Sequence, residues 1–326
     1  MQFTVPKDQL KEAVTGLTKV SSRNQHNPIH SAVQFVGEGD TVKITTANPN
    51  ERLTYIASEA SGTGTFTIDF KELKDFLGTL GRGKGIVAFD LLDEHIHAGF
   101  FGNNAPIYHA FNRPQGVDFP PAPDIKALAN EFKEDVFEHV RLAMPSVSLE
   151  VARTGMTGVL LEPDGIVASN GAELVKFNCR TGLPRKVILP KTRVLSTGFL
   201  AGNVGTIQAD DKHCRIKTER WEYVTTTVDE VYPNYSSVIP KTLKYAVELT
   251  KDDIALLRDK VPSMDTVTDY QAIHIHMTKD AVHVLPETLG TPHLKIDAKF
   301  IGTDPLTLSI SRKILLRALE LGFHSF

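Results

Sequence analysis

Cysteine is scarce in this chain: its 326 residues include only Cys179 and Cys214, without a Cys-x-x-Cys pattern. Two isolated cysteines indicate neither a disulfide framework nor a zinc site, and we expect both to be reduced packing residues. No apolar run approaches the length of a membrane span, and residues 1–7 lack the basic start and apolar stretch of a signal peptide. We therefore expect a cytoplasmic protein that does not enter a membrane.

Excess charge is lacking too, since the formal net charge is −3 at pH 7. That value argues against a uniformly basic nucleic-acid binder, but it does not say how the charge is distributed. The chain has 41% hydrophobic and 23% charged residues, which is ordinary for a soluble globular protein, and it is long enough for two or three domains.

One pattern occurs three times along the chain. A short alternating strand runs into an amphipathic helix at residues 66–77, 187–195 and 308–316, and the starting residues are 121 positions apart in both intervals. In the first copy Leu73, Phe76, Leu77 and Leu80 fall on one helix face. A period of this length predicts repeated domains rather than a solenoid.

A second strand-then-helix unit opens each copy, near residues 3–10, 132–144 and 247–254. Alternating segments at 31–36, 41–46 and 52–58, separated by Gly and Asn-Pro-Asn turns, predict antiparallel hairpins between the helices. We therefore predict an α+β fold of three tandem domains, each with two helices and antiparallel sheets. The predicted bounds are 1–123, 124–242 and 243–326, and the third copy is about 84 residues long where the period calls for about 120.

Several segments resemble the β sliding clamp of bacterial DNA polymerase III, the processivity subunit. They are Thr157 to Glu162, the run ending Ala168-Ser169-Asn170-Gly171, Tyr232 to Lys241, the first five residues and Asp118-Phe119-Pro120. The resemblance covers essentially the whole chain and is strongest over 150–242. One departure is Asn170-Gly171-Ala172-Glu173-Leu174, where the family usually has Asp-Gly-His-Arg-Leu, so a basic residue is replaced by Glu173 and partner preference is expected to differ.

The resemblance implies a protein that is not an enzyme and needs no cofactor or metal. It implies a head-to-tail homodimer ring that surrounds duplex DNA without reading its sequence. A clamp loader opens the ring, which tethers the replicative polymerase and other proteins that carry short clamp-binding peptides. The alternative is a clamp-like peptide-binding module that cannot close a ring.

Charge placement agrees with a DNA-lining surface. The six segments expected to carry helices (7–23, 69–84, 131–141, 185–193, 251–260 and 312–320) hold 20 basic and 13 acidic residues, or +7, so the remainder carries −10. Such a cationic lining suits weak contacts with phosphates. The candidate DNA-binding residues are Lys7, Lys11, Lys19, Arg23, Asn24, Lys71, Lys74, Arg82, Lys191, Arg193, Arg312 and Lys313. Each cation could equally belong to a solvated helix face, and the loop with Arg23 and Asn24 could be an ordinary connection.

By resemblance, a pocket for partner peptides is lined by Arg153, Met156, Ser169, Gly171, Ala172, Glu173, Leu174 and Pro240. Met and Leu suit an adaptable apolar groove, although Met156 and Leu174 could also be plain core.

Three other signals are weak. Residues 78–84 match Gly-x4-Gly-Lys, but Gly85 replaces the Ser or Thr of a phosphate-binding loop, and a helix precedes the segment where a strand is needed. The pairs His95/His97 and His274/His276 lack an evident third metal ligand. No nucleophile elbow or oriented histidine supports hydrolase chemistry, so we expect no catalytic residues.

Overall fold

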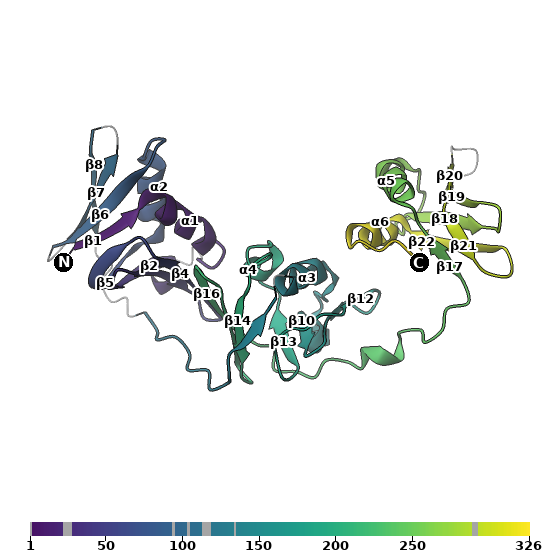
Figure 1. The fold of residues 1–326 in the computed structure, drawn as a ribbon, viewed down its shortest axis with the longest axis horizontal. Coiled ribbons are helices and arrows are strands. Elements are labelled where there is room, and N and C mark those ends of the chain that lie inside the picture. Colours follow the sequence, from purple (N-terminus) through teal and green to yellow (C-terminus); the bar gives the residue numbers. More distant parts are fainter. Residues whose placement is uncertain are drawn as a thin grey trace. The chain divides into compact units, whose positions relative to one another are not determined.

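The computed structural model describes residues 2–21, 28–92, 95–102, 105–112, 119–133, 135–288 and 293–326. The chain divides into two compact units, Met1–Asn234 and Tyr235–Phe326. Both units combine helices with antiparallel sheets (Figure 1). The predicted α+β class is therefore confirmed. No helix among the described residues is both long and apolar enough to cross a membrane.

The first unit is built on a sheet with the strand order β8-β7-β6-β1-β5-β2-β3-β4-β16-β15-β14-β9. Its strands are β1 Gln2–Pro6, β2 Ala32–Gly39, β3 Val42–Ala47, β4 Glu51–Ala57, β5 Ser61–Asp69, β6 Gly85–Leu91, β7 His95–Gly102, β8 Ile107–Asn112, β9 Asn130–Phe132, β14 Gly205–Ala209, β15 His213–Lys217 and β16 Trp221–Thr226. A second sheet, β12-β11-β10-β13, contains β10 Gly158–Glu162, β11 Gly165–Ser169, β12 Leu174–Phe177 and β13 Val187–Pro190.

Strands β4 and β16 join the part of the sheet before residue 123 to the part after it. They pair antiparallel, with Trp221 opposite Tyr55. The Trp221 ring packs edge-on against Tyr55 at 4.8 Å and against Phe199 at 4.5 Å between ring centroids. Gly16 is required beneath this ring because a Cβ there would collide with it. Aromatic packing therefore reinforces the backbone pairing at this junction.

The first two helices follow the sequence pattern closely. Helix α1, Lys7–Leu17, begins directly after Pro6 and buries Leu10, Val14 and Leu17. Helix α2, Phe70–Thr79, is capped by Asp69, whose carboxylate accepts hydrogen bonds from the backbone N–H groups of Lys71 and Glu72. The predicted apolar face of α2 is buried. Helix α3, Val136–Ala143, packs against α4.

Helix α4 differs from the expectation. A strand running into an amphipathic helix was expected over 187–195, and strand β13 occupies 187–190, but α4 spans only Arg193–Ser196, so most of the segment 185–193 that was counted as helix-bearing is not helical. Thr192 caps its first turn by accepting a hydrogen bond from the Leu195 amide. Gly198, at a φ of 69°, follows immediately and is suited to ending a helix. Arg185 and Lys186 therefore precede the strand, where they pair with Asp211 and Glu162.

The second unit has a two-stranded sheet, β17-β21, and a four-stranded sheet, β20-β19-β18-β22. Its elements are β17 Ala246–Glu248, α5 Lys251–Lys260, β18 Ala272–Met277, β19 Val282–Pro286, β20 Leu294–Ile296, β21 Lys299–Ile301, β22 Leu306–Ser311 and α6 Arg312–Glu320. Thr250 and Asp253 form a capping box at the start of α5. Leu257 of α5 and Leu315 and Leu319 of α6 are buried in a core that includes Ile273 and Ile275.

Candidate nucleic-acid interface and partner pocket

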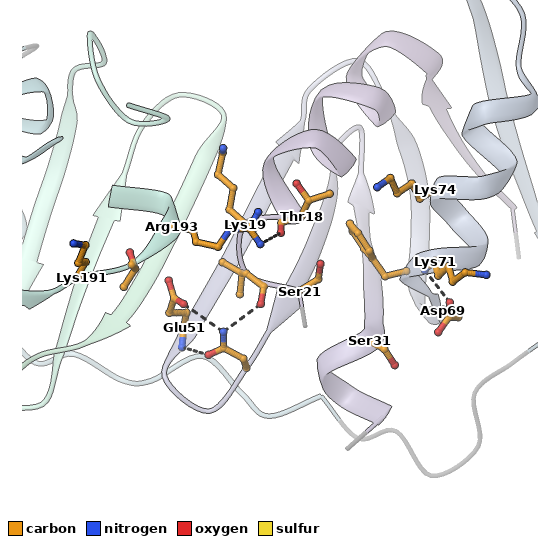
Figure 2. A pocket seen from close by; sticks show the side chains of 14 residues that line it. Thr18, Lys19, Ser21, Ser31, Glu51, Asp69, Lys71, Lys74, Lys191 and Arg193 are labelled. Atoms are coloured by element: carbon orange, nitrogen blue, oxygen red, sulfur yellow. Dashed lines mark hydrogen bonds between the residues drawn. The ribbon is translucent and has the colours of Figure 1, made fainter. Parts of the chain in front are cut away.

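A groove of about 1030 Å³ in the first unit gathers basic side chains from three separate segments (Figure 2). The segments are the end of α1 with the residues after it, the start of α2, and the turn from β13 into α4. The groove, called the basic groove below, is lined by Thr18, Lys19, Val20, Ser21, Ser31, Asn48, Glu51, Asp69, Phe70, Lys71, Lys74, Lys191, Thr192 and Arg193. Five of the predicted DNA-binding residues, Lys19, Lys71, Lys74, Lys191 and Arg193, thus lie in one depression.

A hydrogen-bonded network fixes the polar floor of this groove. The Tyr223 hydroxyl donates to Glu51 Oε1 at 2.6 Å and lies 3.0 Å from Thr192 Oγ1. Burial and the neighbouring Glu51 carboxylate raise the pKa of Tyr223 well above its ordinary value, so its hydroxyl keeps its proton. Asn48 Nδ2 donates to the Val20 carbonyl at 3.2 Å and lies 3.4 Å from Glu51 Oε2. The carboxylate of Glu51 is therefore held by neutral donors.

The cations of the groove are held only loosely. The Lys19 ammonium lies 5.6 Å from the centroid of the Phe199 ring, and Arg193 Nη1 donates to the Thr18 carbonyl at 3.4 Å. Lys71 pairs with Asp75 at 3.3 Å through side chains that are largely exposed. Exposed pairs of this kind contribute little to stability, so these side chains can turn toward an anion at small cost.

The balance of charge in the groove favours an anionic ligand. Five cations face two carboxylates, Glu51 and Asp69, so the lining carries +3. The helices alone are less basic than expected: within their observed bounds they hold 12 basic and 9 acidic residues, or +3 rather than +7. The cationic character therefore comes partly from residues that flank the helices, such as Lys19 and Lys191. Phosphate groups are bound chiefly by such charges.

Lys7 does not fit a DNA-contacting role. Its side chain is 2% exposed, and its ammonium donates to the Gly81 carbonyl at 2.9 Å and to the Gly83 carbonyl. It also lies 5.1 Å from the centroid of the Phe100 ring. A buried ammonium that carbonyl oxygens already satisfy cannot reach a phosphate, so the assignment of Lys7 to DNA is corrected to a structural role.

Arg312 is similarly committed inside the second unit. Its guanidinium donates to the Met264 carbonyl at 2.8 Å, to the Pro262 carbonyl at 3.0 Å and to Gln271 Oε1 at 3.1 Å. These bonds tie the start of α6 to the residues after α5. The guanidinium therefore helps to hold this part of the fold together, and its assignment to DNA stays a prediction.

The remaining predicted DNA residues are scattered. Lys11, Arg82 and Lys313 are exposed but do not line the basic groove. Arg23 and Asn24 lie outside the described residues.

A second depression, of about 520 Å³, brings together part of the predicted peptide pocket. This depression, called the partner pocket below, is lined by Pro145, Val147, Ser148, Leu149, Glu150, Arg153, Asn170, Gly171, Ala172 and Lys191. Of the predicted residues it includes Arg153, Gly171 and Ala172. Met156, Glu173 and Leu174 are half-buried outside this lining, and Ser169 is buried with its hydroxyl donating to the Glu173 carbonyl at 2.8 Å. Pro240 is an exposed residue of the second unit.

Arg153 organises one wall of the partner pocket. It pairs with Glu150 at 2.9 Å, and its Nη1 donates to the Asn170 carbonyl at 2.7 Å. Its guanidinium covers Gly171, where a Cβ would clash with it and where φ is 91°. The positive φ favours glycine at position 171, and a larger residue there would also displace the end of the Arg153 side chain. The other wall is apolar, and its Leu149 is 80% exposed.

The segment 78–84 and the pair His274/His276 serve local structure. The carbonyls of Gly81 and Gly83 accept from Lys7, so this loop offers acceptors to a cation rather than amides to a phosphate. His274 and His276 hydrogen-bond through Nδ1 with Ser309 at 2.7 Å and Thr307 at 2.9 Å. Over the part of the chain that the structure describes, no three His, Cys, Asp or Glu residues are grouped so that they could hold a metal ion.

Comparison with known proteins gives one consistent result. The β sliding clamp of Pseudomonas aeruginosa is 23% identical over 259 residues, covering 74% of this chain and 68% of that protein. A crystal structure of the Bacillus subtilis polymerase sliding clamp matches with a TM-score of 0.83 at 17% identity, over all of this chain and 91% of that one. This chain has the β sliding clamp fold. The P. aeruginosa DNA polymerase III β subunit matches with a TM-score of 0.80 at 16% identity, over 100% and 92% of the two chains.

The resemblance to β sliding clamps predicted from the sequence is therefore confirmed. No family model matches the chain. Sequence reasoning missed several residues that shape the two depressions of this clamp fold, namely Asn48, Glu51, Thr192 and Tyr223 in the basic groove and Leu149 and Glu150 in the partner pocket. Only Asn48 carried a local signal, because the Asn-Pro-Asn turn it begins was recognised as a hairpin connection.

Proposed function

We propose that this chain is a non-catalytic DNA sliding clamp, a processivity subunit that surrounds duplex DNA and tethers a replicative polymerase. The observation that carries the proposal is the basic groove within a clamp fold: five cations from three segments, four of them exposed and Lys19 half-buried, meet in one depression. Side chains that are long, exposed and weakly engaged can follow a phosphate backbone without fixing one register.

The working assembly in this proposal is a head-to-tail homodimer that closes as a ring and is opened by a clamp loader. Each chain contributes three domains, 1–123, 124–242 and 243–326. The 121-residue sequence period and the recurring strand-then-helix pattern support this division. A head-to-tail contact closes into a ring when the rotation that relates one chain to the next returns to the first chain. Such a dimer therefore needs only one type of interface between its chains.

Partner proteins, in this proposal, insert short peptides at the partner pocket. The adjoining apolar wall and the Arg153 side of this pocket support binding of a peptide that carries both apolar and polar side chains. Arg153, Gly171 and Ala172 line the pocket itself, while Met156, Ser169, Glu173, Leu174 and Pro240 are assigned to the site by resemblance.

Retention on DNA tests the topological part of the proposal. After treatment with the clamp loader, the chain should remain on nicked circular DNA and leave linear DNA through its ends. Equal and rapid loss from both substrates would refute the proposal of a closed ring.

Sedimentation distinguishes the ring from a clamp-like module that binds peptides without closing. A dimer, at twice the chain mass, is expected at micromolar concentration. If only monomer sediments across that range, the peptide-binding module is the better description.

A further inference from the structure

Lys191 is shared by the two depressions of the first unit. It lines both the basic groove and the partner pocket, and it is the one residue common to their linings among the described residues. Figure 2 shows it at the edge of the groove beside the turn into α4. A cation in this position can face either of two ligands.

The backbone around Lys191 is fixed on both sides. Pro190 ends β13 opposite Gly158 of β10, and Thr192 caps α4 while its hydroxyl lies 3.0 Å from the Tyr223 hydroxyl. The Lys191 side chain itself is exposed, and no hydrogen bond or ion pair to another described residue engages its ammonium. The backbone at Lys191 is therefore fixed, while its ammonium group is available to bind a ligand.

The other charges of the partner pocket are already used. Glu150 and Arg153 form an ion pair with each other, and Arg153 also donates to the Asn170 carbonyl. Among the charged residues of this lining, Lys191 thus remains without a partner in the described part of the chain, and the lining also contains the apolar side chains of Pro145, Val147 and Leu149. A ligand with a carboxylate next to apolar side chains would complement this arrangement.

We propose that an acidic peptide in the partner pocket pairs with Lys191 and so withdraws this cation from the DNA backbone. Peptide binding and DNA binding are then negatively coupled through one side chain. This inference rests on the proposed function, because it takes duplex DNA as the ligand of the basic groove. The pairing with Lys191 makes the partner pocket prefer acidic peptides. Binding of such a peptide then weakens the binding of the chain to DNA.

The expected coupling is modest. One exposed ion pair is exchanged for another, so the peptide should weaken DNA binding by about two- to five-fold. Linkage requires DNA to weaken peptide binding by the same factor.

The test uses two labelled peptides, Ac-Leu-Leu-Asp-Leu-NH2 and the same peptide with Asn in place of Asp, and a 20-base-pair duplex. Peptide and DNA affinities are measured by fluorescence anisotropy at fixed salt, each with and without the other ligand at saturation. The parent chain should bind the Asp peptide more tightly than the Asn peptide. Of the two peptides, only the Asp peptide should weaken DNA binding.

Two variants separate this coupling from general repulsion between an acidic peptide and DNA. Lys191→Gln should bind DNA more weakly and should lose the coupling, so that the Asp peptide no longer changes its DNA affinity. Lys74→Gln removes a cation of the basic groove that does not line the partner pocket. It should weaken DNA binding to a similar extent and retain the full coupling.

Several results would overturn the inference: equal or undetectable binding of the two peptides, no effect of the Asp peptide on DNA, or an undiminished effect in Lys191→Gln. Failure of the proposed function looks different. In that case the parent chain does not bind the duplex even without peptide.

Discussion

The salt dependence of DNA binding offers a quantitative test of the basic groove. If its five cations all contact phosphates, the logarithm of the affinity should fall against the logarithm of salt concentration with a slope of about −4.5 per chain. Raising the salt from about 50 to about 200 mM should then weaken binding about 500-fold.

Replacing Lys19, Lys74 and Arg193 by Gln leaves two cations in the groove. The slope should then be about −1.8, and the same increase in salt should weaken binding only about 12-fold. The assay is a titration of a fluorescent duplex, without loader, at several salt concentrations.

A matched control is available in the same unit. Lys176, Lys212 and Lys217 are exposed, lie outside the groove, and remove the same charge when changed to Gln. The control should keep a slope near that of the parent chain. If both triple variants shift the slope equally, net charge rather than the groove governs binding, and the assignment of the groove is wrong.

Three further outcomes are expected. Trp221→Ala should lower the free energy of unfolding of the first unit by about 3–5 kcal/mol in urea titrations, because it empties the junction with Tyr55 and Phe199; a change under about 1 kcal/mol would argue against this junction. Lys7→Met should lower the free energy of unfolding of the same unit by about 1–3 kcal/mol and leave the salt slope of DNA binding unchanged. A reduced slope would instead show that Lys7 contacts DNA. Burial raises the pKa of Cys179 to about 11 and that of Cys214 to about 12. The unfolded chain loses these protons first, so stability should fall as the pH rises from about 9, and less steeply in Cys179→Ser/Cys214→Ser, as followed by urea midpoints.

Much of the local structure could be predicted because its causes are local. Pro6 and the spacing of Leu10, Val14 and Leu17 specify the start and buried face of α1. The same reasoning holds for α2, where the capping residue Asp69 precedes the apolar face. The 121-residue repeat likewise indicated which segments share a design.

The helix at residue 193 shows where local reasoning fails. The repeat predicted a helix comparable to α2, but the segment contains Pro190, and Gly198 follows after a single turn. Glu72, which the 121-residue period places at the position of Arg193, is followed by seven further helical residues in α2. A sequence repeat predicts the order of elements in each copy, here a strand followed by a helix, but not the exact length of each element.

The sequence by itself determined the α+β class, the repeated pattern and the resemblance to sliding clamps, because these follow from periodicity, capping residues and short motifs. Tertiary structure alone decided which cations are available. Lys7 begins α1 and Lys19 follows its end, and the two look alike in sequence, but the fold buries Lys7 against the carbonyls of Gly81 and Gly83 and leaves Lys19 in the basic groove. Whether a charge meets carbonyl oxygens or solvent depends on residues about seventy positions away, which no local pattern specifies.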